Sequence, residues 1–173
     1  MRIHQKNRDN YEKGFVLVLA LMLITLMSVL AITSFELVIS TTRITNNHKK
    51  YLQALYIADS GIEHTLCVLS KINWAGFNWQ ESSFSNLNLS NVDASSNNPD
   101  WFYSSGSWQM TNSNDLGNSY TVTMTMIVDG NNPNNNRFRV ESTGTVSSFT
   151  KTIVAEIGNI PDPKILLWME KEM

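Results

Sequence analysis

The sequence predicts an α+β protein in which one long N-terminal helix, half transmembrane and half amphipathic, packs on a small antiparallel β-sheet. Three features predict it. An apolar run covers residues 15–35, an apolar periodicity of three and four residues continues to residue 72, and the last third of the chain alternates polar and apolar residues between turn formers. At 173 residues the chain has room for such an anchor and one small domain.

The apolar run is long enough to cross a membrane. It reads FVLVLALMLITLMSVLAITSF and contains no charge and no proline. At about 1.5 Å per residue, these residues span about 30 Å as a helix, which is the thickness of the hydrocarbon core. Four basic residues precede the run, and the first charge after it is Glu36. Because lysine and arginine hold flanking segments on the cytoplasmic side, we expect residues 1–14 inside and the C-terminal domain exported.

A cleaved secretory signal peptide fits this run less well. Such peptides have an apolar stretch of about 7–15 residues followed by a small-residue cleavage site. Here the run is longer, and the small residues after Ala31 are mixed with Ile32 and Phe35. Hydropathy alone leaves an ordinary single-pass anchor open.

Residues 36–72 are expected to continue the same helix. No proline falls between Phe15 and Ile72, so one uninterrupted helix would be about 87 Å long. Apolar residues recur on one face, with a single seven-residue step: Ile44, Tyr51, Leu55, Ala58, Ile62, Leu66 and Leu69. This face predicts packing on a globular head. Gly61 costs roughly 1 kcal/mol inside a helix, which predicts a bend or a close contact there.

The sheet is predicted from three segments near the C-terminus, residues 120–128, 137–146 and 149–157. The connection from Asp129 to Asn136 is dense in turn formers, and Ser147-Ser148 is a short link. These segments predict a three-stranded antiparallel meander inside residues 119–158.

Two other segments complete the chain. Residues 73–118 are expected to form a long variable connection with short strands, one of them near residues 101–110. Residues 159–173 are a linker followed by a short amphipathic tail, which is marginal as an isolated helix. Docking on a partner and an unstructured end are both open for this tail.

Cys67 is the single cysteine, so no intramolecular disulfide is expected, and we predict a small buried apolar residue. Four tryptophans gather in the variable segment: Trp74, Trp79, Trp101 and Trp108. They are expected to pack in the core, with a carbohydrate-binding or adhesive face as the alternative.

The sequence offers little chemistry for catalysis, metals or nucleic acid. It lacks paired cysteines, a Gly-rich phosphate loop and a nucleophile elbow, so no enzymatic role and no cofactor are expected. His4, His48 and His64 are too scattered for one metal site. The oxygen-rich loop after Asp129 lacks the acidic ligands of a calcium loop, and a solvated turn is the preferred interpretation. A net charge of −2 without a basic stripe does not fit a nucleic-acid partner.

Three motifs together resemble a known family. Lys13-Gly14-Phe15 lies at the start of the apolar run, LQALYIADSGIE follows at residues 52–63, and RFRVESTGTV and TKTIVAEI close the sheet. They resemble type IV pilins and pseudopilins, and most closely the PilX-type or GspK-type minor subunits. Asp59 and Ser60 stand where that pattern commonly has Glu and Ala. The resemblance covers roughly two thirds of the chain and leaves out residues 73–118.

The resemblance implies a processing step and a location. Residues 1–14 would be a prepilin leader, cut between Gly14 and Phe15 by a prepilin peptidase that also methylates Phe15. The chain would then be a single-pass protein of the inner membrane before it enters a filament. The implied partners are other pilins or pseudopilins, the peptidase, the inner-membrane assembly machinery and membrane lipid.

One position departs from the family pattern. Major pilins usually carry glutamate at the fifth residue after the cut, which is Leu19 here. We therefore expect a minor, tip-proximal or assembly-priming subunit of a type IV pilus or of a related secretion or DNA-uptake pseudopilus. The alternative is a single-pass membrane-anchored binding domain that keeps residues 1–14.

Overall fold

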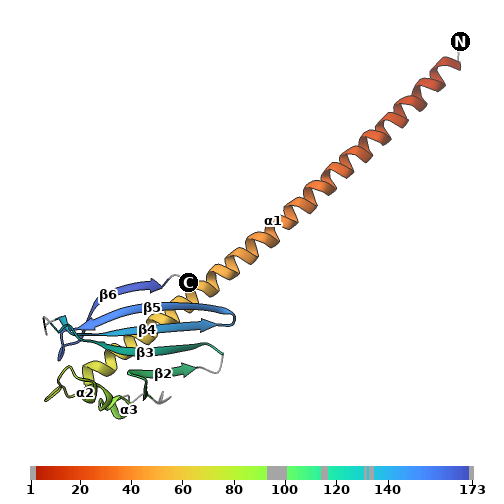
Figure 1. Ribbon diagram of the computed structural model, residues 1–173. Helices are drawn as coiled ribbons and strands as arrows, with labels where there is room; N and C mark the ends of the chain where they lie inside the picture. Colours follow the sequence, from red (N-terminus) through yellow and green to blue (C-terminus); the bar gives the residue numbers. More distant parts are fainter. Residues whose placement is uncertain (1–2, 93–100, 114–116, 131, 133–134, 172–173) are drawn as a thin grey trace. The chain divides into compact units, whose positions relative to one another are not determined.

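The computed structural model describes residues 3–92, 101–113, 117–130, 132 and 135–171. The side chains described begin at Phe15 and omit Asn91. The long helix α1 runs from Ile3 to Lys71 without interruption, as the absence of proline predicts (Figure 1). The chain divides into two compact units, Met1–Asn47 and His48–Met173, which are described separately below.

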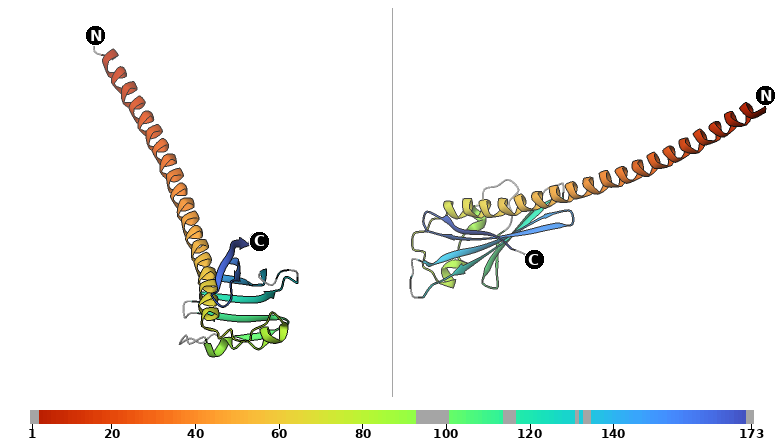
Figure 2. Two further views of the ribbon diagram at one scale, coloured as in Figure 1. Left: turned by 90° about the vertical axis from the view of Figure 1, so that its left-hand side faces the viewer. Right: turned by 90° about the horizontal axis from the view of Figure 1, so that it is seen from above.

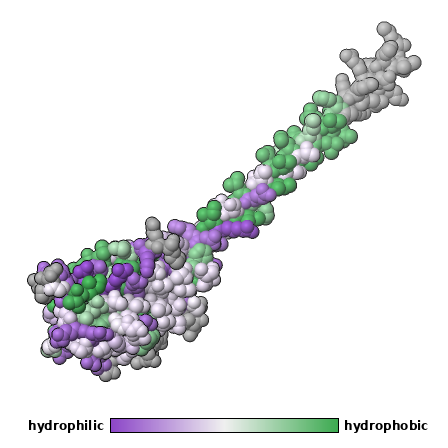
Figure 3. Space-filling model, in the orientation of Figure 1, coloured by the Kyte–Doolittle hydropathy of each residue, from purple (hydrophilic) through white to green (hydrophobic). Residues whose placement is uncertain are grey.

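In the first unit, every described side chain from residue 15 to residue 47 is exposed. Hydrophobic residues dominate the surface of this helix nearer its N-terminus, and hydrophilic residues appear farther along it (Figure 3). The hydroxyl groups of Thr25, Ser28, Thr33 and Ser34 donate to backbone carbonyls three or four residues earlier, over 2.7 to 3.1 Å. Such bonds satisfy polar groups inside the helix itself, which suits a segment surrounded by lipid.

The second unit contains a six-stranded antiparallel sheet in the order β1-β2-β3-β4-β5-β6. The strands are β1 Phe102–Ser104, β2 Ser107–Ser113, β3 Ser119–Ile127, β4 Arg137–Val146, β5 Phe149–Gly158 and β6 Lys164–Lys171. Every strand pairs with its neighbours in sequence, so each connection is a hairpin. The three predicted strands correspond to β3, β4 and β5.

The sheet is larger than the predicted meander. The candidate strand near residues 101–110 is a hairpin of β1 and β2, whose turn Ser105-Gly106 has positive φ at both residues. At the other edge the tail, expected to be a separate amphipathic segment, forms β6 on β5. Pairing with β5 stabilises these residues as a strand, whereas an isolated helix of the same length would be only marginally stable.

The C-terminal part of α1, which belongs to the second unit, lies along one face of the sheet (Figure 2). Ala54, Ala58, Ile62, Val68 and Leu69 are buried there. From the predicted face, Tyr51, Leu55 and Leu66 are half-buried, which confirms the amphipathic pattern in this unit. Ile44 lies in the first unit and is exposed, so its assignment to that buried face is wrong.

Two short helices, α2 Glu81–Ser85 and α3 Leu89–Val92, close one end of the core. Phe84, Leu87 and Leu89 pack there, and Trp108 Nε1 donates to the Phe84 carbonyl at 2.7 Å. Trp101 and Trp108 are buried, which confirms the core assignment for both, whereas Trp74 and Trp79 are half-buried against the core.

Cys67 is exposed, so the prediction of a buried cysteine is wrong. The buried helix face continues through Thr65, Val68 and Leu69. Residue 67 falls between these positions on the solvent side, next to the exposed Glu63 and Ser70. Helical phase, rather than residue type, decides its environment.

Candidate functional site

The candidate site is the exposed apolar part of α1. From Phe15 to Lys71 the helix is long and apolar enough to cross a membrane, and its most apolar window is entirely unburied. Phe15 is 68% exposed and Leu19 is 49% exposed. This surface has the length, composition and exposure that a surrounding of lipid or of other apolar helices requires.

The predicted cleavage position lies inside this helix. Because α1 begins at Ile3, both Gly14 and Phe15 are helical. A protease binds its substrate in an extended form, so the helix has to unwind locally before a cut between them. Glycine favours this, since it is roughly 1 kcal/mol less stable than alanine inside a helix.

Close backbone approach joins α1 to the sheet within the second unit. A Cβ atom on Gly144 of β4 would lie 2.2 Å from the Ala54 carbonyl oxygen and 2.4 Å from the Ala58 nitrogen. A Cβ on Gly61 of α1 would lie 2.2 Å from Ser142 Oγ. Two glycines, one on each element, therefore allow the helix to lie almost directly on β4. The close contact expected at Gly61 is confirmed.

A buried hydroxyl lies at the same contact. Ser142 is fully buried beneath Gly61, and its Oγ has no hydrogen-bond partner among the described residues. Tyr120, also beside Gly61, holds its hydroxyl 2.6 Å from His64 Nδ1 and accepts a bond from Asn112 Nδ2 at 3.1 Å. His64 is thereby part of the helix–sheet contact.

Polar contacts also tie β6 to α1. Tyr51 donates its hydroxyl to Glu170 at 2.8 Å, and Lys151 pairs with the same carboxylate at 2.7 Å while lying over the Tyr51 ring. The hydrogen bonds from Lys151 and Tyr51 lower the pKa of Glu170, and the bond to Glu170 raises the pKa of Lys151. Nearby, Trp168 Nε1 donates to Asp59 Oδ1 at 3.0 Å. These contacts hold the edge strand against the helix.

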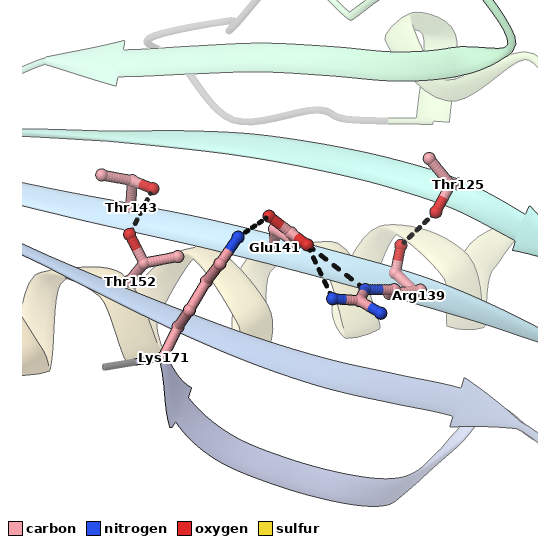
Figure 4. A network of polar contacts seen from close by, with 6 residues as sticks. All are labelled: Thr125, Arg139, Glu141, Thr143, Thr152 and Lys171. Atoms are coloured by element: carbon pink, nitrogen blue, oxygen red, sulfur yellow. Dashed lines mark hydrogen bonds and ion pairs between the residues drawn. The ribbon is translucent and has the colours of Figure 1, made fainter. Parts of the chain in front are cut away.

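The opposite face of the sheet is polar. Glu141 accepts hydrogen bonds from Arg139 at 3.0 Å and from Lys171 at 3.2 Å, and Thr143 and Thr152 bond to each other at 2.9 Å (Figure 4). Partial burial acts to raise the pKa of Glu141, but the bonds from Lys171 and Arg139 outweigh it and lower that pKa. This face is a solvated surface of ordinary side-chain pairs.

The other candidate sites considered from the sequence, for a metal, for calcium and on the tryptophans, give weaker support for a function. Within the described residues, no three His, Cys, Asp or Glu side chains lie together as a metal site. Asp129 accepts bonds from Asn132 and Asn135, as in a turn, while residues 131, 133 and 134 of that loop lie outside the described residues. Trp74, Phe77 and Trp79 line an open cavity of about 530 Å³ next to Ile160.

Sequence reasoning missed two features of this arrangement. Gly144 was assigned to a strand without a role, although glycine inside a strand can signal close backbone approach. Strand β6 was missed because LLWM at residues 166–169 does not alternate. All four side chains are 40–54% exposed, so neither face of this edge strand is buried.

The junction and the long helix together match a known family. A family model described as PilX N-terminal matches residues 13–63, beginning at Lys13 directly before Gly14 and Phe15. Over these residues the N-terminal helix is similar to that of PilX-type pilin-like proteins. No curated protein and no solved structure matches the chain.

The PilX N-terminal match covers both the exposed apolar helix and the first buried turns. It ends at Glu63, just after the Gly61 contact with the sheet. The resemblance noted for the N-terminal motifs is thus confirmed, and with it a relation to type IV pilus proteins and an apolar anchor helix.

Proposed function

We propose that this PilX-type chain is a minor structural subunit of a type IV pilus, or of a related secretion or DNA-uptake pseudopilus. The observation that carries the proposal is the family match from Lys13 onward on a helix whose side chains from residue 15 to residue 47 are all exposed. A surface of this kind needs either lipid or other apolar helices around it. The membrane surrounds the helix with lipid before assembly, and the filament surrounds it with other apolar helices afterwards.

The processing step follows from the family pattern. A prepilin peptidase cuts between Gly14 and Phe15 on the cytoplasmic side, and Phe15 becomes the methylated N-terminus. The cut removes the basic residues of the leader, which otherwise hold the N-terminus in the cytoplasm, and it leaves the apolar anchor intact. The head, with its sheet and the second half of α1, is exported from the inner membrane.

Assembly then exchanges lipid for protein around α1. Because lipid tails are as apolar as leucine, packing and the few polar groups decide which helices associate. We infer that the inner-membrane assembly machinery supplies the work that moves the subunit from bilayer to filament. Other pilins or pseudopilins are its direct neighbours.

Leu19 favours a minor, tip-proximal or assembly-priming role. It lies in the apolar segment at the fifth residue from Phe15, where major pilins commonly have glutamate. A carboxylate inside lipid is costly and is kept for a partner. A subunit at the tip has no neighbour above it whose terminal amine needs such a carboxylate.

The proposal is tested by following the full chain into sheared surface fibres. Wild-type protein is expected in the fibre fraction, and Gly14→Val is expected to keep its leader and stay in the membrane fraction. Asn10→Val, four residues earlier in the leader, serves as the matched control and should behave as wild type. Equal recovery of wild type and Gly14→Val in membranes alone would instead identify an anchored domain with an uncleaved N-terminus.

A further inference from the structure

We propose that the open aromatic cavity beside the C-terminal end of α1 binds a short neutral oligosaccharide. The cavity has a volume of about 530 Å³, and its lining consists of Ile72, Asn73, Trp74, Ala75, Phe77, Trp79, Ile160 and Pro161. It lies entirely in the second unit, whereas the proposed assembly surface lies in the first. The inference therefore goes beyond the proposed function and adds a ligand site to the head.

Two short segments build the cavity. Residues 72–79 directly follow α1, and Ile160 and Pro161 belong to the connection between β5 and β6. The first segment turns tightly, because the Phe77 nitrogen donates to the Trp74 carbonyl at 3.1 Å. A lining made of two short segments suits a compact ligand of a few rings, whereas an extended peptide needs a longer groove.

The aromatic rings of the cavity are held by the core. The rings of Trp74 and Trp79 lie 29° and 35° from the plane of the buried Phe138 ring, with centroids 5.9 and 5.0 Å away. Phe77 meets both indole rings edge to face, at 5.1 and 5.4 Å. Trp74 Nε1 donates to the Leu69 carbonyl at 3.1 Å. The half-buried indole rings thus form a platform whose geometry exists before a ligand arrives.

Two hydrogen-bond donors at the cavity are unused. The indole N–H of Trp79 forms no hydrogen bond within the part of the chain that the structure describes, although a half-buried indole usually has a partner. Asn73 accepts a bond from the Ala75 nitrogen through Oδ1 at 3.0 Å, and its Nδ2 group is left to donate. Both donors belong to residues that line the cavity, so a bound molecule with hydroxyl oxygens can accept from them.

This combination of groups matches a neutral sugar. The C–H groups on one side of a pyranose ring stack on aromatic rings, and the hydroxyl groups at its rim accept hydrogen bonds from N–H donors. None of the lining residues is charged, so an acidic sugar or a phosphate would lack a cation there. A lipid tail would cover the indole N–H of Trp79 without offering it an acceptor, which costs free energy. A neutral oligosaccharide satisfies both the rings and the donors.

Calorimetric titration of the full chain tests the site, in a detergent without a sugar headgroup. The probes are cellotriose, chitotriose and maltotriose. We expect saturable binding of at least one of them, and Trp79→Leu is expected to weaken that binding about tenfold through the lost ring contacts. Phe102→Leu removes an aromatic ring that is 52% exposed outside the cavity, so this matched control should bind as wild type.

A conservative variant separates recognition from folding. Trp79→Phe keeps an aromatic ring on the Phe138 platform and removes only the indole N–H, so its thermal unfolding should stay close to that of wild type. We expect it to bind the same trisaccharide about fivefold more weakly, the effect of one lost hydrogen bond. This variant also decides the question if Trp79→Leu does not fold.

Three results would overturn the proposal: no saturable binding of any of the three sugars, wild-type affinity in Trp79→Phe and in folded Trp79→Leu, or binding of decaproline or sialyllactose in place of the neutral sugars. Recovery in sheared fibres keeps this outcome apart from the proposed function. A chain that enters fibres but binds none of the sugars overturns the sugar site alone. A chain that binds a sugar but stays in the membrane contradicts the filament role alone.

Discussion

At the scale of single residues, Gly61 shows why glycine is needed at the helix–sheet contact. A Cβ there would meet Ser142 Oγ at 2.2 Å and Tyr120 and Val122 side-chain atoms at 3.0 Å. We predict that Gly61→Ala destabilises the head, because overpacking typically costs about 1–3 kcal/mol and exceeds the roughly 1 kcal/mol that alanine gains in a helix. Thermal unfolding of the full chain in detergent measures it, with Gly130→Ala, where a Cβ meets nothing within 4 Å, as the control.

Ser142 provides a second prediction at the same contact. Its hydroxyl is buried without a partner, so Ser142→Ala is expected to be neutral or to stabilise the head by up to about 1 kcal/mol. Combined with Gly61→Ala, it removes the closest clash and should recover part of the loss. Strictly additive free energies of unfolding in this double-mutant cycle would show that the two positions do not meet.

Gly144 tolerates even less change than Gly61. A Cβ on Gly144 would meet main-chain atoms of Ala54 and Ala58, which a side-chain rotation does not move. We expect Gly144→Ala to cost more than Gly61→Ala, about 3 kcal/mol or more, as chemical denaturation of the same detergent sample would show. An equal or smaller cost would mean that the helix does not rest on β4 at this point.

Glu170 links residue chemistry to pH. Its pKa is below the usual 4.5 in the folded chain because Lys151 and Tyr51 hydrogen-bond to the carboxylate. Its contribution to stability is therefore present above pH 4.5 and is lost as the pH falls through the lowered folded value. We predict that Glu170→Gln flattens the fall of thermal stability in this acidic range, as melting curves of the variant and of the wild type between neutral and acidic pH would show.

Lys151 acts in the opposite direction at high pH. Its pKa is raised above 10.5, first by the hydrogen bond to Glu170, so its contribution persists below pH 10.5 and is lost only as the pH rises through the higher folded value. The Tyr51–Lys151–Glu170 contacts are thus intact across the neutral range.

At the scale of elements, the apolar run of α1 is predicted to depend on the absence of charge. Leu23 lies inside the run and is 50% exposed. A lysine at the centre of a membrane helix costs about 2.5–3.5 kcal/mol on insertion scales, so we expect Leu23→Lys to lower the carbonate-resistant membrane fraction. Leu23→Met keeps the volume and the apolarity and should match wild type. Unchanged retention of Leu23→Lys would argue against a lipid-facing position.

The elements also show what the sequence could predict. The helix followed from the apolar run, the apolar period after it and the absence of proline, and β3, β4 and β5 followed from alternation and turn residues. Strand β6 did not, because an edge strand with LLWM exposed on both faces lacks alternation. Cys67 was misplaced because its apolar character was weighed above its helical phase.

The contact partners of an element are set by the fold, not by its own pattern. Gly144 and Ala58 lie far apart in sequence and meet only when the sheet has formed. The Lys13-Gly14-Phe15 junction, in contrast, is a local signal and could be recognised directly. The candidate assembly helix was therefore predictable from the sequence, whereas the strand and the residues on which it packs were not.

At the scale of the whole molecule, one helix supplies two units with different surroundings. The part in the first unit exposes apolar side chains over its whole circumference, and the part in the second unit buries one face against a sheet. Such a division suits a protein that exchanges lipid for neighbouring helices while its head stays folded. The account depends on removal of the leader before that exchange.

The mass of the N-terminal peptide of chains isolated from surface fibres tests this most directly. The account predicts a chain that begins at Phe15 and carries one added methyl group, together with loss of the leader peptide. A fibre-associated chain that still begins at Met1, or a chain found only in membranes with its leader attached, would contradict it.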